Sequence, residues 1–253
     1  MVTHELLNNI SHKDLRILTE RSLDLGDNIP SILAFPNEFR QLQADFPICF
    51  CKDPDTGTFH CAAILGFEDE ENLFFSNGSW QPQYVPLMLQ KGPFLIGESS
   101  PNNSDNDSKP MIYIDMDHPR VNSSGGEPVF LEHGGNTDFL EKIRSVLDAI
   151  YQGRKYSDTF IELVLENELI EDFALEINLS DGSRNSLRGF YTIAEKKLNA
   201  LSYKVIEKLM VSGYLQAIYM MIASFENFKK LIYLKDQGVA TCCLLYTSDA
   251  ADE

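Results

Sequence analysis

The chain has 253 residues, of which 43% are hydrophobic and 11% are aromatic, which is enough to bury the core of one large domain or two small ones. Its 38 acidic residues outnumber its 21 basic residues, so the formal net charge at pH 7 is −17. A surplus of carboxylates repels phosphate groups, and the basic residues look scattered. We therefore expect neither general nucleic-acid binding nor docking to anionic membranes.

No window reaches the roughly 18 to 20 uninterrupted apolar residues of a membrane span. The best candidate runs from Tyr214 to Phe225 and is followed by charged residues. The N-terminus lacks the basic start and apolar core of a signal peptide. These patterns predict an acidic, soluble protein without a transmembrane segment, located in the cytoplasm by default, although association with the cell surface stays open.

Short apolar runs separated by turn residues predict strands through the first half of the chain. These expected strands cover residues 47–52, 59–67, 73–75, 94–97 and 111–116. Pro36 suits the first turn of a short helix over 36–42. Residues 98–110 are rich in Ser, Asn, Asp and Pro and cannot bury apolar area, so they are expected to form a mobile surface loop.

From Asn136 the apolar spacing becomes helical and predicts a helix that ends at Gly153, with a second helix starting at Ser157. Strict alternation around Asp181-Gly182 then predicts a β-hairpin over about 173–191. Thr192 and Glu195 match a capping box at the start of another helix. Two more helices follow, one ending near 212–213 and one through 215–232.

This order of elements predicts an α+β fold. Residues 1–135 form a β-rich half with an antiparallel or mixed sheet, and residues 136–240 form a helical half that contains the hairpin. The two halves could be subdomains that meet near 132–136, or parts of one integrated domain.

The last eleven residues, CLLYTSDAADE (243–253), match the translation of the mosaic-end adapter used in transposase-made sequencing libraries. Such a tail is excluded from fold and function reasoning. Removing its three carboxylates changes the formal charge to −17 + 3 = −14, and the native chain is expected to end near 240–242.

Three cysteines, Cys49, Cys51 and Cys61, crowd into one β-rich stretch and form neither an even disulfide set nor a CxxC pair. Reduced, buried thiols are therefore expected. Cys49 and Cys51 would share one strand face and, with His60, could form a metal site, but core packing is the preferred interpretation.

Several segments together resemble the SapC family of bacterial proteins of about 250 residues. They are NNISHKDLR, AFPNEFRQLQADFPICF, AAILGFEDEENLFF, YVPLMLQKGPFLIG, IYIDMDHPRV, LSDGSRNSLRGFYTIAEKKLNAL and SGYLQAIYMMIASFENFKKLI, in order from residue 8 to 235. The family name implies an association with surface-layer proteins, without an accepted biochemical activity. A peptide-permease label used for similar proteins conflicts with the absence of spanning segments.

The sharpest candidate site lies at Asp115 to Arg120, where a strand ends in a cluster of polar residues. Asp115 and Asp117 would share one face of the strand, with His118 and Arg120 just beyond. The cluster could bind a small ligand, and Asp115, Asp117 and His118 could hold a divalent metal, with Glu132 or His133 completing a site. The alternative is a turn at 117–119 with Asp115 in an ordinary ion pair, and we predict no metal.

Trp80, the only tryptophan, is a further candidate contact residue, although it could equally fold back over the β core. The Gly pairs at 125–126 and 134–135 lack the context of a phosphate-binding loop. Met and aromatic residues in 214–234 could form a partner-binding face or a homodimer contact, with core packing preferred.

We therefore expect a non-enzymatic accessory or interaction protein of the SapC type with no cofactor, whose partner is an unknown protein or a second copy. The alternative is an enzyme or ligand binder that uses Asp115, Asp117, His118 and Arg120.

Overall fold

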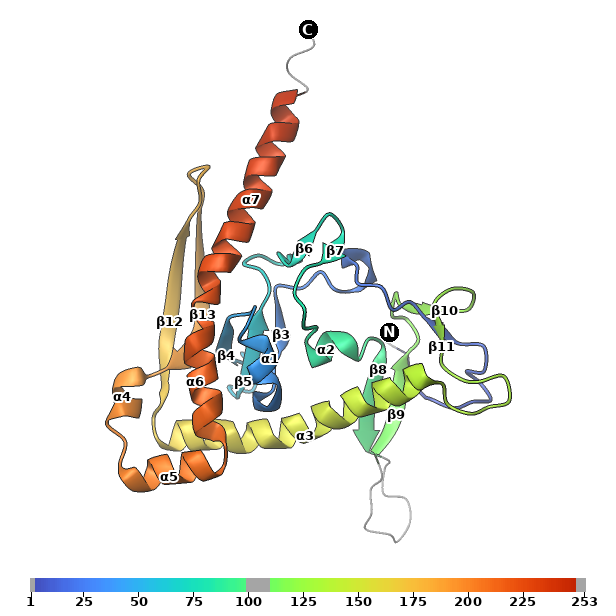
Figure 1. The fold of residues 1–253 in the computed structure, drawn as a ribbon, viewed down its shortest axis with the longest axis horizontal. Coiled ribbons are helices and arrows are strands. Elements are labelled where there is room, and N and C mark those ends of the chain that lie inside the picture. Colours follow the sequence, from blue (N-terminus) through green and yellow to red (C-terminus); the bar gives the residue numbers. More distant parts are fainter. Residues whose placement is uncertain (1–2, 99–109, 249–253) are drawn as a thin grey trace. The chain divides into compact units, whose positions relative to one another are not determined.

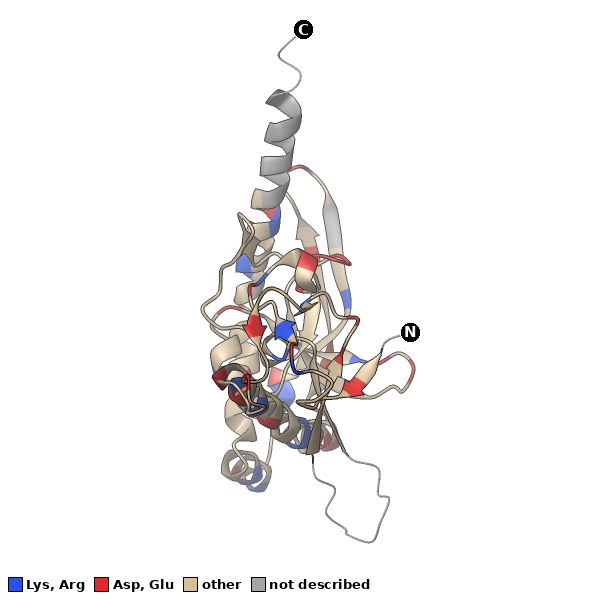
Figure 2. Ribbon diagram, turned by 90° about the vertical axis from the view of Figure 1, so that its right-hand side faces the viewer, with Lys and Arg blue, Asp and Glu red and all other residues tan. Residues whose placement is uncertain are grey.

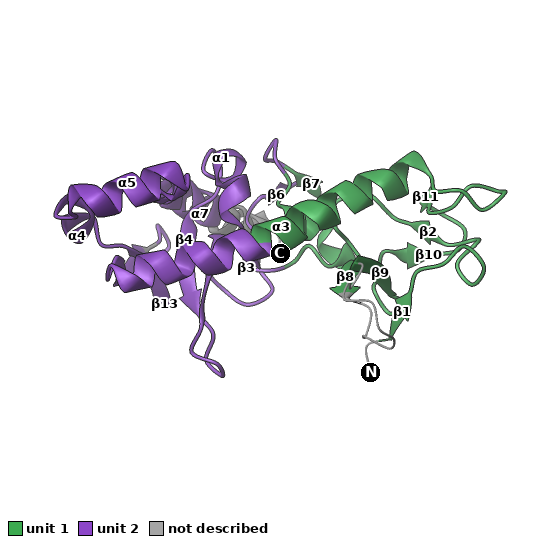
Figure 3. Ribbon diagram, turned by 90° about the horizontal axis from the view of Figure 1, so that it is seen from below, with its two compact units in different colours: residues 1–28, 78–80, 85–153 green, residues 29–77, 81–84, 154–253 purple. Residues whose placement is uncertain are grey.

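The computed structural model describes residues 3–98 and 110–248, so the loop expected at 98–110 lies almost entirely outside the described residues. β-sheets occupy mainly the first half and helices mainly the second, which confirms the α+β class (Figure 1). The chain forms two compact units. Unit 1 comprises residues 1–28, 78–80 and 85–153, and unit 2 comprises 29–77, 81–84 and 154–253 (Figure 3).

Unit 1 is built from two small antiparallel sheets, with strand orders β1-β9-β8 and β10-β2-β11, and from the first part of α3. Its elements are β1 (His4–Leu6), β2 (Arg16–Ile17), η1 (Leu23–Leu25), β7 (Ser79–Trp80), α2 (Leu87–Gln90), β8 (Phe94–Glu98), β9 (Pro110–Asp115), β10 (Val121–Asn122), β11 (Glu127–Pro128) and α3 (Asp138–Glu166). Phe94 and Ile114 are fully buried in its core, together with Leu140 and Leu147 of α3.

Unit 2 is organised around an antiparallel sheet of five strands in the order β12-β13-β4-β5-β3. Its elements are β3 (Ser31–Leu33), η2 (Pro36–Glu38), α1 (Phe39–Leu42), β4 (Ile48–Lys52), β5 (Phe59–Ile64), β6 (Phe75–Ser76), β12 (Ile170–Asn178), β13 (Arg184–Ile193), α4 (Glu195–Asn199), α5 (Tyr203–Val211), α6 (Tyr214–Ser224) and α7 (Asn227–Ser248). The expected hairpin is present as β12 and β13, and Figure 1 shows it beside α7, where the Ser180 amide donates to Asp236 at 2.8 Å.

The two compact units do not follow the expected boundary near 132–136. The division instead falls at Gly153, inside α3, and unit 2 takes strands β3, β4 and β5 from the first half of the chain. Strands β4 and β13 are joined at Cys51↔Phe190 and Phe50↔Tyr191, so the late hairpin extends an early sheet. Sequence-local patterns cannot reveal such a long-range pairing.

The helix break predicted at Gly153 is wrong, because α3 runs without interruption from Asp138 to Glu166. A glycine inside a helix costs about 1 kcal/mol relative to alanine. Phe160 and Val164 further along the helix are both 0% exposed, and burying two such side chains contributes more than that cost.

Two other helix boundaries also differ from expectation. Thr192 stays in β13, paired with Glu171, so α4 begins at Glu195 with Ala194 at its N-cap and no side-chain cap. The expected helix over 215–232 is divided into α6 and α7. A residue outside the two helices holds the α6–α7 junction, since the Asn227 side-chain amide donates a hydrogen bond to the carbonyl of Gln43 at 2.8 Å.

Candidate functional site

The two carboxylates of the predicted cluster serve the turn that follows β9. Asp117 Oδ2 accepts a hydrogen bond from the Thr3 amide at 3.0 Å, and Asp115 Oδ1 accepts one from the Asp117 amide at 3.1 Å. Asp115 is half-buried and Asp117 is exposed. Both groups therefore accept hydrogen bonds from backbone donors, whereas the turn interpretation placed Asp115 in an ion pair.

Arg120 points in a different direction, into the interior of unit 1, and is 2% exposed. Its Nη1 donates to the carbonyls of Leu18 at 3.0 Å and Glu20 at 2.6 Å. Its Nη2 forms an ion pair with Asp27 Oδ2 at 2.6 Å. A single guanidinium thus binds three acceptors of the 18–27 segment, which suits the fixed fork of arginine.

Asp27 is shared by a second arginine. Arg21 Nη1 lies 3.2 Å from Asp27 Oδ1 and also donates to the Leu89 carbonyl at 2.8 Å. The other Asp27 oxygen accepts a hydrogen bond from the Ser22 amide at 3.1 Å, which closes the loop around η1. Two guanidinium groups therefore lie on one buried carboxylate, and this arginine–aspartate network carries a net positive charge.

His118 lies beside this network and its ring packs against Gly26. A Cβ atom added to Gly26 would lie 3.7 Å from the ring. Its Nδ1 accepts a hydrogen bond from the Arg120 amide at 3.2 Å, an arrangement that requires this nitrogen to be unprotonated. Partial burial lowers the pKa of His118, and the neighbouring Arg120 charge lowers it further. The neutral imidazole is thus the form that fits this site.

A small cavity of about 80 Å³ adjoins the network within unit 1. Arg21, Lys91 and Arg120 supply its basic side chains, and burial lowers the pKa of Lys91. The rest of its wall comprises Ile17, Leu18, Thr19, Gln90, Gly92, Pro93, Phe94, Phe139 and Ile143. The cavity wall therefore combines basic side chains with mainly apolar ones.

A larger groove of about 450 Å³ shares five residues with this cavity, namely Thr19, Arg21, Gln90, Phe139 and Ile143. It continues along the first part of α3 to Val146 and has Glu127, Asp138 and Lys142 on its wall. The cavity and the groove together form a continuous candidate binding region inside unit 1.

The residues proposed for a metal do not converge. Within 3–98 and 110–248, no group of three or more His, Cys, Asp or Glu side chains is arranged to hold a metal ion. Glu132 and His133 are exposed in the turn after β11, and the structure gives neither of them a bond to Asp115 or Asp117.

The model of the SapC family matches residues 7–231, which is most of the chain. The chain belongs to the SapC family. No curated protein and no solved structure gives a significant match to this SapC protein.

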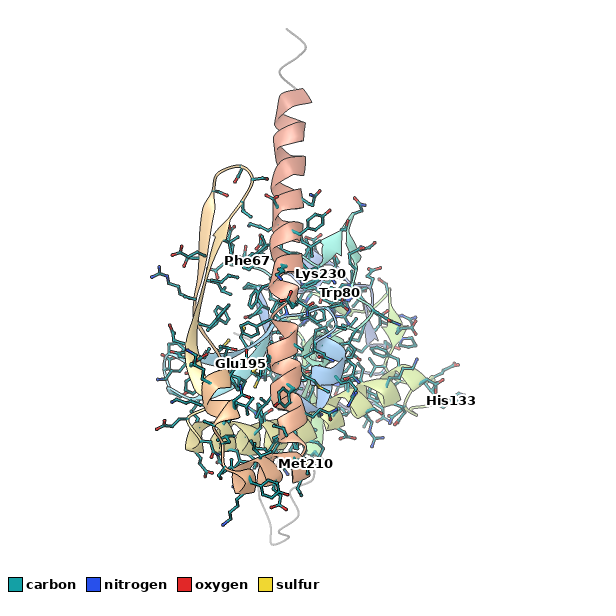
Figure 4. The ribbon with its side chains drawn as sticks, turned by 60° about the vertical axis from the view of Figure 1, so that its left-hand side comes forward. Phe67, Trp80, His133, Glu195, Met210 and Lys230 are labelled. Atoms are coloured by element: carbon teal, nitrogen blue, oxygen red, sulfur yellow. The ribbon has the colours of Figure 1, made fainter. Side chains whose placement is uncertain are left out.

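Trp80 is half-buried in β7 (Figure 4). It lines an open depression of about 630 Å³ together with Gly78, Ser79 and the loop residues Glu20, Arg21, Ser22, Asp24 and Leu25. Trp80 is therefore close to the arginine–aspartate network, and its partial exposure lies between the two predicted alternatives.

Cys49, Cys51 and Cys61 of this SapC protein are free thiols in the β4–β5 pair. Burial raises the pKa of the Cys51 thiol to about 12 and raises those of Cys49 and Cys61 as well. All three remain protonated near neutral pH. The expectation of reduced, buried thiols holds for Cys49 and Cys61, while Cys51 is partly exposed.

No described helix is by itself long and apolar enough to span a membrane. Tyr203–Val211 and Tyr214–Gln237 pass the length and composition test only as a pair, and the pair is bent by 90°. Ile218 and Met221 of α6 are fully buried, as are Phe228 and Leu231 of α7 at 4% or less, so the Met-rich and aromatic stretch serves mainly as core.

Sequence reasoning missed Asp27, Arg21 and Lys91, which stand far from Arg120 in the chain.

Sequence reasoning also treated the basic residues as scattered, whereas residues 184–235 hold nine Lys or Arg and three Asp or Glu, a surplus of 9 − 3 = 6. Several of these charges pair within unit 2, as do Lys230 with Asp45 and Lys235 with Glu71. Figure 2 shows acidic and basic residues interspersed along most elements.

Proposed function

We propose that this SapC protein is a non-enzymatic accessory protein of the cell surface that works by associating with a second copy of itself through α5. One observation carries the proposal: α5 exposes three large apolar side chains, with Tyr203 at 80%, Met210 at 62% and Val211 at 80%. Large apolar residues exposed singly are common on protein surfaces, but a group on one short helix is a recognised mark of an interaction site.

The three residues share a face of α5. Met210 and Val211 follow Tyr203 by seven and eight residues, which is about two turns of an α-helix. The neighbouring Leu209 is 0% exposed and therefore lies on a different face of the helix. Figure 4 shows Met210 on α5, and we name Tyr203, Met210 and Val211 the α5 patch.

The charges around the α5 patch favour a second copy as the occupant. Lys204, Glu207 and Lys208 are exposed on the same helix, so one surface carries both signs. In an antiparallel contact between two α5 helices around a twofold axis, the lysines of one copy would face Glu207 of the other. In such a contact the charged side chains of the two copies pair with each other, so no different protein is needed to neutralise them.

The link to the cell surface rests on the family name, which associates SapC proteins with surface layers. Layers of this kind form by repeated contacts between protein copies. A self-associating protein fits an accessory role there.

The test uses sedimentation velocity over a range of protein concentrations, with the chain ended at residue 242 to remove the adapter-encoded tail. The wild-type chain should shift from monomer to dimer as concentration rises, and Met210→Glu should keep it monomeric. Tyr233→Glu is the matched control, because Tyr233 is 61% exposed on α7, outside the α5 patch. A wild-type protein that stays monomeric throughout, or a loss of dimer in both variants alike, would refute self-association through α5.

A further inference from the structure

We propose that the basic cavity of unit 1, together with the adjoining groove along α3, binds a small organic monoanion: a carboxylate head on a short apolar body. This ligand site is independent of the α5 patch and of self-association. The charge of the cavity, its hydrogen-bonding capacity and the character of its wall all favour such a ligand.

The charge of the cavity wall is positive. Arg21, Lys91 and Arg120 all line it, and Asp27 is the carboxylate that both arginines contact. Asp115 is the acidic group that acts electrostatically on Lys91, but it does not line the cavity. Partly buried positive charge that exceeds its paired negative charge favours an anionic ligand.

Hydrogen-bonding capacity is also left over. Arg21 makes its two hydrogen bonds through Nη1, so its Nε and Nη2 groups have no protein acceptor among the described residues. These two nitrogens form one edge of the guanidinium, and that edge matches the two oxygens of a carboxylate. Lys91 Nζ donates to the Gly92 carbonyl at 3.2 Å and retains two further N–H groups. Arg120 is already engaged by three acceptors and contributes mainly its charge.

The remaining wall is mostly apolar, with Thr19 and Gln90 as its polar side chains. Ile17, Phe94 and Ile143 are buried at 6% exposure or less, and Phe139 is partly buried against the same core. A volume of about 80 Å³ suits a head group of a few atoms, and the groove of about 450 Å³ has room for a longer apolar body.

The groove also argues for a single negative charge. Glu127 and Asp138 stand on its wall, where Lys142 and the shared Arg21 are the basic side chains. A second anionic group on the body of the ligand, or a phosphate displaced into the groove, would face these carboxylates. A monocarboxylate avoids that repulsion, because its one charge stays beside Arg21 and Lys91.

The experiment compares hexanoate with hexanamide, which has the same length and no charge, and with inorganic phosphate. Titration calorimetry measures affinity, and chemical-shift changes at the amides of Gly92 and Ile143 locate the ligand.

Three variants test the assignment. Arg21→Gln removes the free guanidinium edge. Thr19→Phe blocks the shared rim from an exposed position, so it preserves the fold even where Arg21→Gln perturbs it. Arg144→Gln is the control, because Arg144 is an exposed arginine of α3 that does not line either space.

We expect hexanoate to bind with about millimolar affinity, as such a small ligand should. Hexanamide should bind at least about tenfold more weakly, because it lacks the charge-assisted hydrogen bonds. Arg21→Gln and Thr19→Phe should each weaken hexanoate binding by a similar factor, with Arg144→Gln unchanged. The proposal is overturned by no saturable binding of hexanoate, by equal binding of hexanamide or phosphate, or by shift changes that avoid Gly92 and Ile143.

Discussion

Arg120 Nη2 lies 2.6 Å from Asp27 Oδ2, although the two residues are 93 positions apart in the chain and both side chains are only 3% exposed. This ion pair joins the turn after β9 to the loop that contains η1. Arg21 shares the same carboxylate, and both arginines line the cavity of unit 1.

Replacing Asp27 by Asn should destabilise unit 1 strongly. Removing one partner of a buried ion pair leaves the other charge uncompensated, which typically costs about 3–5 kcal/mol. The free energy of unfolding, followed by urea titration with Trp80 fluorescence, measures the change. Glu141→Gln is the control, because the Glu141–Arg144 pair is about half exposed on both sides and should contribute little to stability. A loss below about 1 kcal/mol for Asp27→Asn would contradict the structural role of the pair.

Acid should destabilise unit 1 through His118. The folded-state pKa of His118 is lower than its ordinary value of 6.5, so the unfolded chain binds the proton more readily. The full stability contribution is present above pH 6.5 and is lost as the pH falls from 6.5 through the folded-state pKa.

The measurement is the urea midpoint at pH 7.5 and at pH 5.5. The decrease between these pH values should be smaller in His118→Gln than in the wild type. His60→Gln serves as a comparison in unit 2, since burial lowers the pKa of His60 as well. An unchanged decrease in His118→Gln would show that His118 does not couple to folding.

Ser157→Ala should leave stability unchanged or raise it by up to about 1 kcal/mol. The Ser157 hydroxyl is buried inside α3 and has no hydrogen-bond partner among the described residues. Alanine removes an unsatisfied polar group and has a higher helix propensity. Thermal unfolding measures the effect, with Ser145→Ala on the exposed face of the same helix as the comparison. A clear loss of stability in Ser157→Ala would reveal a partner for this hydroxyl.

The thiols of Cys49 and Cys61 should not react with Ellman's reagent in the folded protein at pH 8. Both are buried and burial raises their pKa, so little thiolate forms. Cys51 is partly exposed but its pKa of about 12 should make its reaction slow. Cys242 and Cys243 are changed to Ser for this assay, and all three remaining thiols should react in urea. Rapid labelling of Cys49 or Cys61 without denaturant would show that the β4–β5 core opens.

Local patterns predicted the elements well where one period dominates. The alternation through Phe173 to Leu179 predicted the hairpin, and the spacing from Phe139 to Ile150 predicted the start of α3, because both signals arise from neighbouring residues. The same reasoning failed at Gly153 and Thr192, where burial of Phe160 and pairing with Glu171 outweigh the local preference.

For the candidate site, the sequence by itself determined which residue types stand at the end of β9 and that Arg120 is among them. Only the tertiary structure decided that Arg120 turns inward to Asp27 while Asp115 and Asp117 bind backbone amides. The physical reason is that a buried guanidinium must find acceptors, and those acceptors come from residues 18–27, far away in the chain. Family membership and the α+β class follow from order and period along the chain, whereas the cavity is lined by three basic residues from distant parts of the chain, two of which meet at the buried Asp27.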